Sequence, residues 1–207
     1  NPAFTVSYSG FVNGDTKANL TTQATVSTSA TTASPVGSYD LVPAGAVSSN
    51  YNFTYVNGVL NVTPAGLLIT ANNQTKAYGA GIPPFTASYS GFVNGDTQSS
   101  LTTLPTMSTT ATASSPIGTY PITANGAVAA NYTITYAPGT LTVGQANLVI
   151  TPNSVSKVYG AAIPTLTASY SGLTNGDTPA SLATQPTMAT TATASSPIGT
   201  YLITATG

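Results

Sequence analysis

The stretch Asn131-Tyr-Thr-Ile-Thr-Tyr-Ala-Pro-Gly-Thr-Leu-Thr-Val143 carries the clearest structural signal in the chain. Apolar and polar side chains alternate on both sides of Ala137-Pro138-Gly139, as they do in strands with one buried face. Pro and Gly between two such runs favour a turn. The stretch therefore predicts a β-hairpin with strands over 132–136 and 140–143.

Further short runs of strand-forming residues surround this stretch, and they predict strands over 67–70, 85–89, 106–112 and 119–123. Asn94-Gly95 is a turn signal, because both residues adopt positive φ at low cost. Only 96–101 favours a helix, of one or two turns with Asp96 as N-cap. The chain is therefore expected to be all-β and mostly antiparallel, with an immunoglobulin-like sandwich as one alternative.

The same pattern recurs along the chain in steps of 81 residues. The motifs that recur are Ser-Tyr-Ser-Gly, Asn-Gly-Asp-Thr and Ser-Pro-(Val/Ile)-Gly-(Ser/Thr)-Tyr, which begin at Ser7, Ser88 and Ser169, at Asn13, Asn94 and Asn175, and at Ser34, Ser115 and Ser196. No insertion or deletion breaks this register. We therefore expect equivalent positions of the three copies to superpose closely.

A junction at Thr63-Pro64-Ala65-Gly66 sets the frame of these tandem β-domains. It predicts a complete repeat at 66–146, a partial repeat at 1–65 that lacks its first strand, and a partial repeat at 147–207 that lacks its last hairpin. A missing strand leaves an open sheet edge, which is unfavourable in water. We therefore expect either a longer array or strand donation between neighbouring chains, and a filament in both cases.

Charge is almost absent from the sequence. Of 207 residues, 3% are charged and the net charge is −1, against about 25% charged residues in ordinary soluble proteins. Three lysines cannot neutralise a run of phosphates, so no nucleic acid partner is expected. No long apolar run occurs, so no membrane-spanning segment is expected. Hydrophobic residues nevertheless make up 41% of the chain, which is enough for a core.

The residue types needed for most site chemistry are missing. The sequence contains no His, Cys, Trp, Arg or Glu, which removes the usual nucleophilic triads and zinc ligands. A complete repeat holds a single carboxylate, so paired-acid catalysis and a strong Ca²⁺ site are also disfavoured. We therefore expect no catalytic residue, no cofactor and no metal, and hence no enzyme.

Lys76 and Asp96 are the two charges of the complete repeat, and Lys157 and Asp177 repeat them. One interpretation is a partly exposed ion pair, which contributes at most about 1 kcal/mol, or two unrelated solvated charges. The other is an intramolecular isopeptide crosslink between the lysine and an Asn, with the Asp as proton shuttle. That chemistry requires a buried carboxyl with a raised pKa, so we favour the first interpretation.

Taken in order, these motifs resemble a known family. The order is Lys-x-Tyr-Gly at Lys76 and Lys157, then Tyr-Ser-Gly, Asn-Gly-Asp-Thr, Gly-Thr-Tyr-x-Ile and Asn-Tyr-x-Ile-x-Tyr-x-x-Gly-x-Leu-x-Val. It is similar to the MBG repeats that occur in tandem in large bacterial surface and secreted proteins, including adhesin-like ones. The resemblance implies a mostly β, β-grasp-like unit with no catalytic residues. Family members often carry an acidic residue after Tyr-Gly, where this chain has Ala80 and Ala161.

The function expected from these features is structural. Identical units that contact only their neighbours suit an extended stalk, fibre or filament of an extracellular bacterial surface protein. The alternative is a multivalent adhesive module that binds glycan or protein, in which many weak sites act together. The expected partners are other copies of the chain itself and, for the alternative, a host or matrix glycan or protein.

Overall fold

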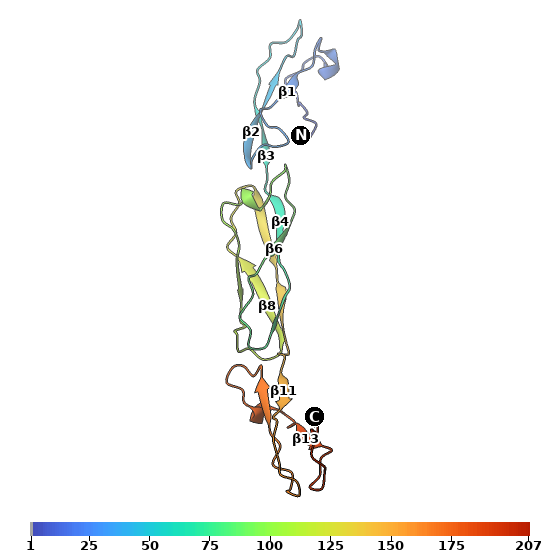
Figure 1. Cartoon of the computed structure of the whole chain (residues 1–207). Coiled ribbons are helices and arrows are strands. Elements are labelled where there is room, and N and C mark those ends of the chain that lie inside the picture. Colours follow the sequence, from blue (N-terminus) through green and yellow to red (C-terminus); the bar gives the residue numbers. More distant parts are fainter. Residues whose placement is uncertain (1) are drawn as a thin grey trace. The chain divides into compact units, whose positions relative to one another are not determined.

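Residues 2–207 are described by a computed structural model, in which strands, turns and single turns of 3-10 helix follow one another (Figure 1). Within that range no helix exceeds three residues, and most strand pairs run antiparallel. The expected all-β, mostly antiparallel class of tandem repeats is therefore confirmed.

The chain forms two compact units, and each combines a terminal repeat with part of the central one. The first unit comprises the chain up to Thr70 together with Ala87–Thr106 and Ala124–Ala137. The second comprises Ala71–Thr86, Met107–Thr123 and Pro138–Gly207. Whether 66–146 folds as an independent domain stays a prediction.

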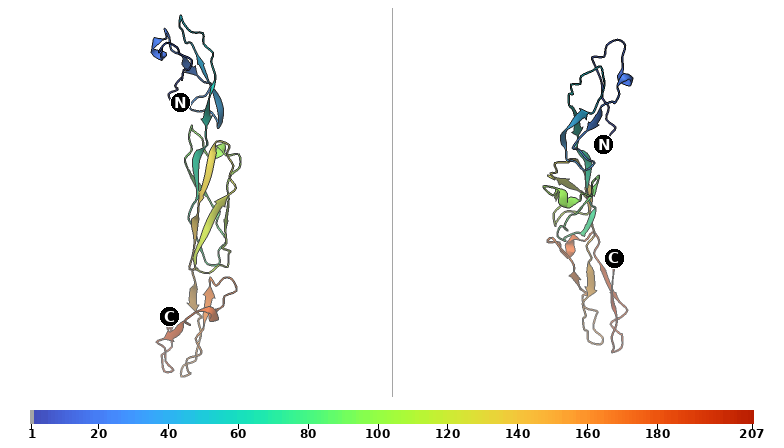
Figure 2. Two further views of the ribbon diagram at one scale, coloured as in Figure 1. Left: turned by 180° about the vertical axis from the view of Figure 1, so that it is seen from behind. Right: turned by 90° about the horizontal axis from the view of Figure 1, so that it is seen from above.

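The first unit contains two three-stranded sheets. One has the order β1-β2-β3 and is antiparallel, and the other has the order β6-β4-β9, with β4 and β9 parallel. Figure 2 shows the yellow β9 beside the teal β4. The elements of this unit are η1 (Lys17–Asn19), β1 (Thr25–Ser27), β2 (Gly37–Ala44), β3 (Gly58–Val62), β4 (Ala65–Ala71), β6 (Ala87–Ser90), η2 (Gln98–Ser100) and β9 (Tyr132–Ala137).

The second unit contains a four-stranded sheet and two strand pairs. The sheet has the order β5-β10-β8-β7, in which β5 and β10 are parallel, and the pairs are β11-β12 and β13-β14. The elements are β5 (Gln74–Ala77), β7 (Thr106–Thr109), β8 (Gly118–Asn125), β10 (Gly139–Gly144), β11 (Val149–Pro152), β12 (Ala168–Ser171), η3 (Pro179–Ser181), β13 (Thr187–Thr190) and β14 (Ile203–Thr206).

The fully buried large side chains all belong to the central repeat. They lie on β4, β8 and β10, at Leu67, Ile69, Ile122, Leu141 and Val143. Alternate residues of each strand point to opposite faces, so β10 buries Leu141 and Val143 while Thr142 between them is exposed. The first and last strands of the repeat therefore supply most of its core.

The predicted hairpin over 132–143 is wrong. Within the described residues, β9 and β10 lie in different sheets: β9 pairs with β4, and β10 pairs with β5 and β8. The pairs Ala65–Tyr132 and Gln74–Leu141 have the same offset along the chain, so the last strand follows the first in one direction. Pro138 interrupts this strand between β9 and β10 without reversing it.

Gly139 is needed for close backbone approach rather than for a turn. A Cβ at this position would lie 2.4 Å from the carbonyl oxygen of Ala71, nearer than real Cβ atoms come. Beside it, the amide of Thr140 donates to Oδ1 of Asn73 over 2.8 Å. The alternation of apolar residues revealed the two strands but not their partners, because the pairing is with residues distant in sequence.

The short helix and its turn occur where expected, with one correction. Asn94 and Gly95 have positive φ, as do their equivalents in the other repeats, and η2 is a single turn. Its N-cap is Thr97, whose Oγ1 accepts from the Ser99 amide, so the assignment of Asp96 as N-cap is wrong. The Asp96 carboxylate accepts a different hydrogen bond, from the hydroxyl of Tyr132.

Candidate functional site

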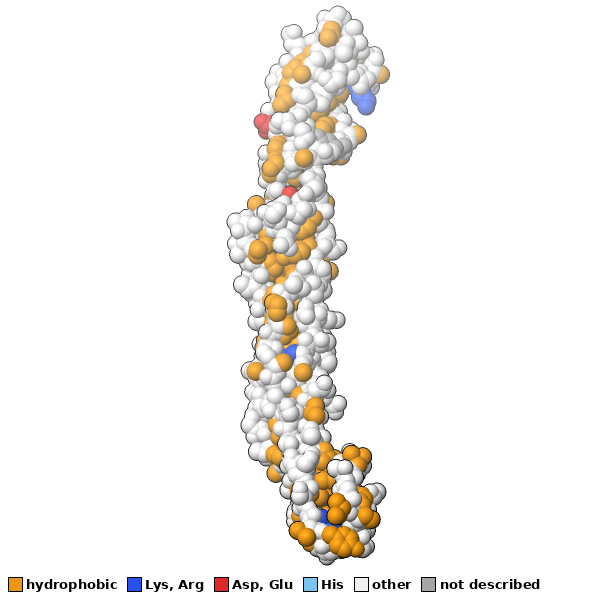
Figure 3. Space-filling model, in the orientation of Figure 1, with side chains coloured by type: hydrophobic (Ala, Val, Ile, Leu, Met, Phe, Trp, Pro, Cys, Tyr) orange, Lys and Arg blue, Asp and Glu red, His pale blue; other side chains and the backbone are white. Residues whose placement is uncertain are grey.

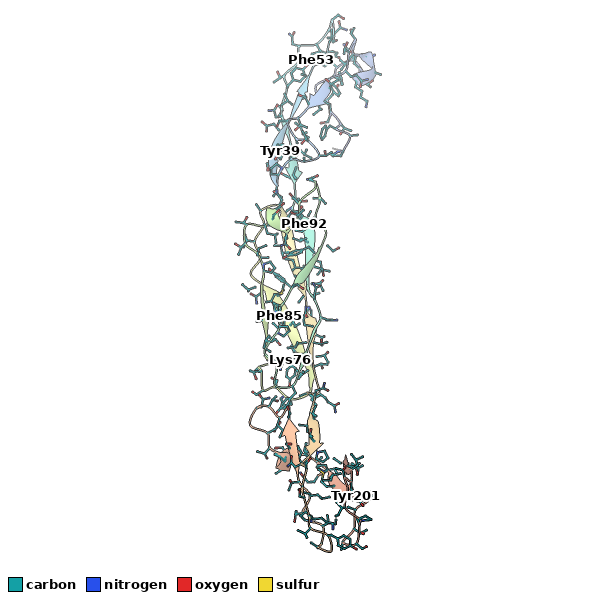
Figure 4. The ribbon with its side chains drawn as sticks, in the orientation of Figure 1. Tyr39, Phe53, Lys76, Phe85, Phe92 and Tyr201 are labelled. Carbon is teal, nitrogen blue, oxygen red and sulfur yellow. The ribbon has the colours of Figure 1, made fainter. Side chains whose placement is uncertain are left out.

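Lys76 lies on β5 with its side chain directed inward, and only 8% of the residue is exposed. Its Nζ donates to the carbonyl oxygens of Ala80, Ala113 and Ala77, over 2.9, 3.0 and 3.3 Å. An ammonium group has three protons to donate, and a buried cation is costly unless they find acceptors. The three carbonyls supply these acceptors, and we call this arrangement the lysine cage. Figure 4 labels Lys76 on the ribbon of the central repeat.

The lysine cage fixes the turn that follows β5. Two of the carbonyls belong to the turn itself, and the third belongs to a loop much later in the repeat. The turn is closed by a hydrogen bond from the Ala80 amide to the Ala77 carbonyl, and the Tyr78 amide donates to the Gly144 carbonyl at the end of β10. Gly79 at its apex has a φ of +80°, a conformation that glycine adopts without steric cost.

The third repeat forms the same cage in a weaker version. Lys157 donates to Ala194, Ala161 and Val158 over 3.1, 3.3 and 3.4 Å. The side chain is less buried than that of Lys76, and its segment forms no strand. Burial by β10 therefore accompanies the tighter cage, since the described part of the third repeat contains no equivalent of β10.

Asp96 belongs to a second arrangement, around Tyr132. The Tyr132 hydroxyl donates to Oδ2 of Asp96 over 2.7 Å and accepts from the Val93 amide over 3.1 Å. Its ring packs edge-on against Phe92. Burial of the ring raises the pKa of Tyr132, and the hydrogen bond to Asp96 raises it further. The hydroxyl thus ties β9 to the Asn-Gly-Asp-Thr turn.

The first repeat contains the same tie. The Tyr51 hydroxyl donates to Oδ2 of Asp15 over 2.7 Å and accepts from the Val12 amide over 3.3 Å. Here the hydrogen bond to Asp15 is the main cause that raises the pKa of the tyrosine. The motif aspartate therefore has one structural role in both repeats, as acceptor for the tyrosine at the start of the last strand.

Specific contacts also join neighbouring repeats. At the first junction, the Val36 amide of the Ser-Pro-Val-Gly loop donates to Oδ1 of Asn131 over 3.0 Å. The amide of Ala65, at the start of the central repeat, donates to the carbonyl of the same asparagine. At the second junction, Gly79 lies so close to Thr174 that a Cβ on Gly79 would come within 2.2 Å of Oγ1 and 2.5 Å of Cβ of that threonine.

Comparison with known families agrees with these motifs. A family profile described as MBG domain (YGX type) matches residues 1–61, 67–142 and 148–207. The chain belongs to the MBG domain family. The searches of curated proteins and of solved structures returned no match.

The charges of the MBG repeat thus have separate partners. Lys76 is held by carbonyls of the second unit, and Asp96 accepts from a tyrosine of the first. These contacts account for both side chains without a bond between them. Lys157 repeats the cage. Asp177 lies in a turn equivalent to that of Asp96, and its amide donates to the Thr174 carbonyl. The ion pair and the crosslink stay hypotheses, and the mass of the intact chain distinguishes them.

The third MBG repeat has an open groove of about 530 Å³, lined by both polar and apolar side chains. Its lining includes Lys157, Tyr159, Leu166, Tyr201 and Ile203. In the central repeat the corresponding segments, β5 and β8, have β10 between them. The groove therefore marks the position where a strand with the pattern of β10 fits, and apolar side chains gather at this end of the chain in Figure 3.

Across residues 2–207, no group of three His, Cys, Asp or Glu side chains is close enough to hold a metal ion. In the same range no helix is long and apolar enough to cross a membrane.

Sequence reasoning found the motif lysine, the aspartate and the glycine turn but missed their partners. Ala113, Asn131 and Thr174 were not predicted, because each contributes a backbone group or a small side chain to a contact distant in sequence. One available signal was an isolated lysine at an inward position of an alternating strand, which requires buried acceptors.

Proposed function

We propose that this chain is a structural segment of an extracellular bacterial surface protein, in which MBG repeats form an extended stalk or fibre. The observation that carries the proposal is that both junctions between repeats are closed by specific contacts, Val36 with Asn131 and Gly79 with Thr174. Repeats that contact only their neighbours add length without changing the unit. Short, closed junctions favour semi-rigid joints over freely flexible linkers.

The surface chemistry supports an extracellular location. Charged side chains are isolated points on a surface of mostly uncharged polar and backbone atoms (Figure 3). Solubility therefore depends on hydroxyl and amide groups, and the absence of Cys makes the fold independent of the redox state around it. Localisation of the full-length protein by protease accessibility on intact cells tests this part of the proposal.

The stalk itself is tested by small-angle scattering on chains with increasing numbers of repeats. An 81-residue globular unit has a radius of gyration of about 12 Å, so each added repeat of a stalk should lengthen the particle by about 30–40 Å. The maximum dimension is expected to rise in proportion to repeat number. A dimension that grows only with the cube root of mass would overturn the proposal.

The alternative is an adhesive module, in which each repeat carries a weak site and the array binds a glycan or protein through many of them. A protein strand fits the groove of the third repeat better than a glycan does, because β10 occupies the equivalent space in the central repeat. A second copy could donate Gly58–Val62, the first-repeat equivalent of β10. Sedimentation at increasing concentration tests this donation, and a glycan array tests the adhesive function.

We also propose that the chain has no catalytic activity. The lysine cage uses all three ammonium protons in hydrogen bonds, and the tyrosine–aspartate contacts hold a turn. An intact mass equal to the sequence mass is expected. Loss of one ammonia or one water per repeat would show a lysine crosslink and would contradict this assignment.

A further inference from the structure

We propose that the Tyr78-Gly79 turn is a docking element, and that its partner is the residue directly before the Asn-Gly-Asp-Thr turn of the following repeat. The inference deepens the proposed stalk function and rests on it, because it assigns the joint between MBG repeats to a specific pair of turns. The Tyr-Gly motif would then serve contact between repeats and not ligand binding.

The closeness of the contact is the first support. An alanine at position 79 would displace Thr174. Its Cβ would lie 2.2, 2.5 and 2.9 Å from Oγ1, Cβ and Cγ2 of the threonine. Gly160 is the equivalent residue of the third repeat, with the same kind of φ, +83°. A Cβ on Gly160 would meet nothing within 4 Å. Of these two turns, only the one that contacts Thr174 leaves no room for a Cβ.

The rigidity of the turn is the second support. The lysine cage holds the carbonyls on both sides of Gly79, and the amide of Tyr78 is bound to the end of β10. A docking element with fixed backbone loses little conformational entropy when it makes contact. The buried lysine, which has no partner of opposite charge in this cage, is explained if its role is to present the turn.

The partner surface is the third support. Thr174 precedes a turn in which its carbonyl accepts from the Asp177 amide over 2.9 Å, and its Oγ1 is buried without a hydrogen-bond partner. The equivalent residues Val12 and Val93 are apolar and are 59% and 47% exposed. The contact with Gly79 thus encloses the Thr174 hydroxyl at a position where the other two repeats have an exposed valine.

Matched variants test the joint. The chain contains no cysteine, so spin labels at Thr142→Cys and Thr187→Cys, both exposed, report the distance distribution across the second junction in the full chain. The Gly79→Ala variant is expected to broaden this distribution at least two-fold. The Gly160→Ala variant has the same backbone strain without the clash and is expected to leave it unchanged.

Two further variants guard against simple unfolding. Thr174→Arg leaves the Tyr-Gly turn intact and should broaden the distribution as Gly79→Ala does, because a large side chain cannot fit against Gly79. Thr174→Gly in the Gly79→Ala background should restore the parent width. Equal widths in the Gly79→Ala and Gly160→Ala chains, or a parent width in Thr174→Arg, would overturn the proposal.

The result separates the joint from the stalk. If the distance distribution is narrow in the parent chain and broad in the Gly79→Ala variant, the joint is present. This conclusion does not depend on the scattering of longer arrays. If the particle lengthens with repeat number but the width of the label distribution is unchanged in the Gly79→Ala variant, the chain is a stalk whose joint uses other contacts.

Discussion

The segments 51–56 and 132–137 have nearly the same sequence pattern, but only the second is paired in a sheet. In the central repeat, Tyr132–Ala137 is strand β9 and pairs with β4. In the first repeat, residues 51–56 form no strand. The side-chain contacts are nevertheless the same: Tyr55 and Tyr136 accept from the amides of Ala46 and Ala127 over 2.9 and 2.8 Å. Local contacts follow from the sequence, whereas the strand requires a partner.

The segments after the first strand repeat this contrast. Gln74–Ala77 is β5 and pairs with β10, whereas residues 155–158 of the third repeat form no strand. Another local contact persists in all three repeats, from the hydroxyls of Tyr39, Tyr120 and Tyr201 to the carbonyls of Pro35, Pro116 and Pro197. The parallel pairing requires both the first and the last strand, whereas each tyrosine contact forms between residues only four positions apart.

The largest effect is expected where the last strand enters a complete core. Leu141→Ala removes a fully buried side chain and should lower the free energy of unfolding of the central repeat by about 2–4 kcal/mol. Leu60→Ala, at the equivalent half-buried position, should cost about 1 kcal/mol, because less apolar area is lost. Urea unfolding of the full chain measures both. Equal costs would contradict the role assigned to the parallel strand pair.

The lysine cage should show the same difference between complete and incomplete repeats. Lys76→Met leaves three carbonyls without their donor in a buried site and should destabilise the central repeat by about 2 kcal/mol. Lys157→Met removes longer hydrogen bonds from a more exposed side chain and should cost less than about 1 kcal/mol. Hydrogen exchange at the Ala80 and Ala161 amides, which close the two turns, reports each turn separately.

Stability at alkaline pH should distinguish the hydrogen bond between Tyr132 and Asp96 from the one between Tyr51 and Asp15. The pKa of Tyr132 is raised from 10.0 by burial and by Asp96. The Tyr132 hydroxyl therefore loses its proton at lower pH in the unfolded chain than in the folded chain. Its contribution to the free energy of unfolding is complete below pH 10 and falls as the pH rises through the folded pKa. Tyr132→Phe should flatten this fall and cost about 1 kcal/mol at neutral pH, since it removes the hydroxyl. Denaturation between pH 8 and 11 measures both effects.

Tyr51→Phe is the matched control, because Tyr51 has the same hydrogen bonds but is less buried. It should flatten the alkaline profile less than Tyr132→Phe does. A larger change from Tyr51 would show that the hydrogen bond to the aspartate, and not burial, governs the titration.

How much of this could be read from the sequence depends on the range of each interaction. The strands over 119–123 and 132–136, the turn at Asn94-Gly95 and the short helix were predicted, because alternation, positive φ and capping are local. The hairpin was wrong, because Pro138-Gly139 marks a change of sheet that only the pairing with β4 and β5 reveals. The candidate site was found in part: Lys76 was singled out, but the carbonyl of Ala113 has no sequence signal.

The smallest expected effect concerns the threonine at the second junction. The position is Val12 and Val93 in the first two repeats and Thr174 in the third, where Oγ1 is buried without a hydrogen-bond partner. A buried polar atom left unpaired costs about 1–3 kcal/mol, and valine has nearly the same shape. Thr174→Val should therefore raise the free energy of unfolding by about 0.5–1 kcal/mol.

The control for this change is Thr187→Val, at an exposed position of β13, which should alter stability by less than about 0.5 kcal/mol. The gain at Thr174 should also depend on the turn that buries it, because only the docked Gly79 turn keeps water from the hydroxyl. In the Gly79→Ala background Thr174→Val should therefore give no gain, and a double-mutant cycle by urea unfolding measures this coupling. A gain of the same size in both backgrounds would show that the third repeat alone buries Thr174.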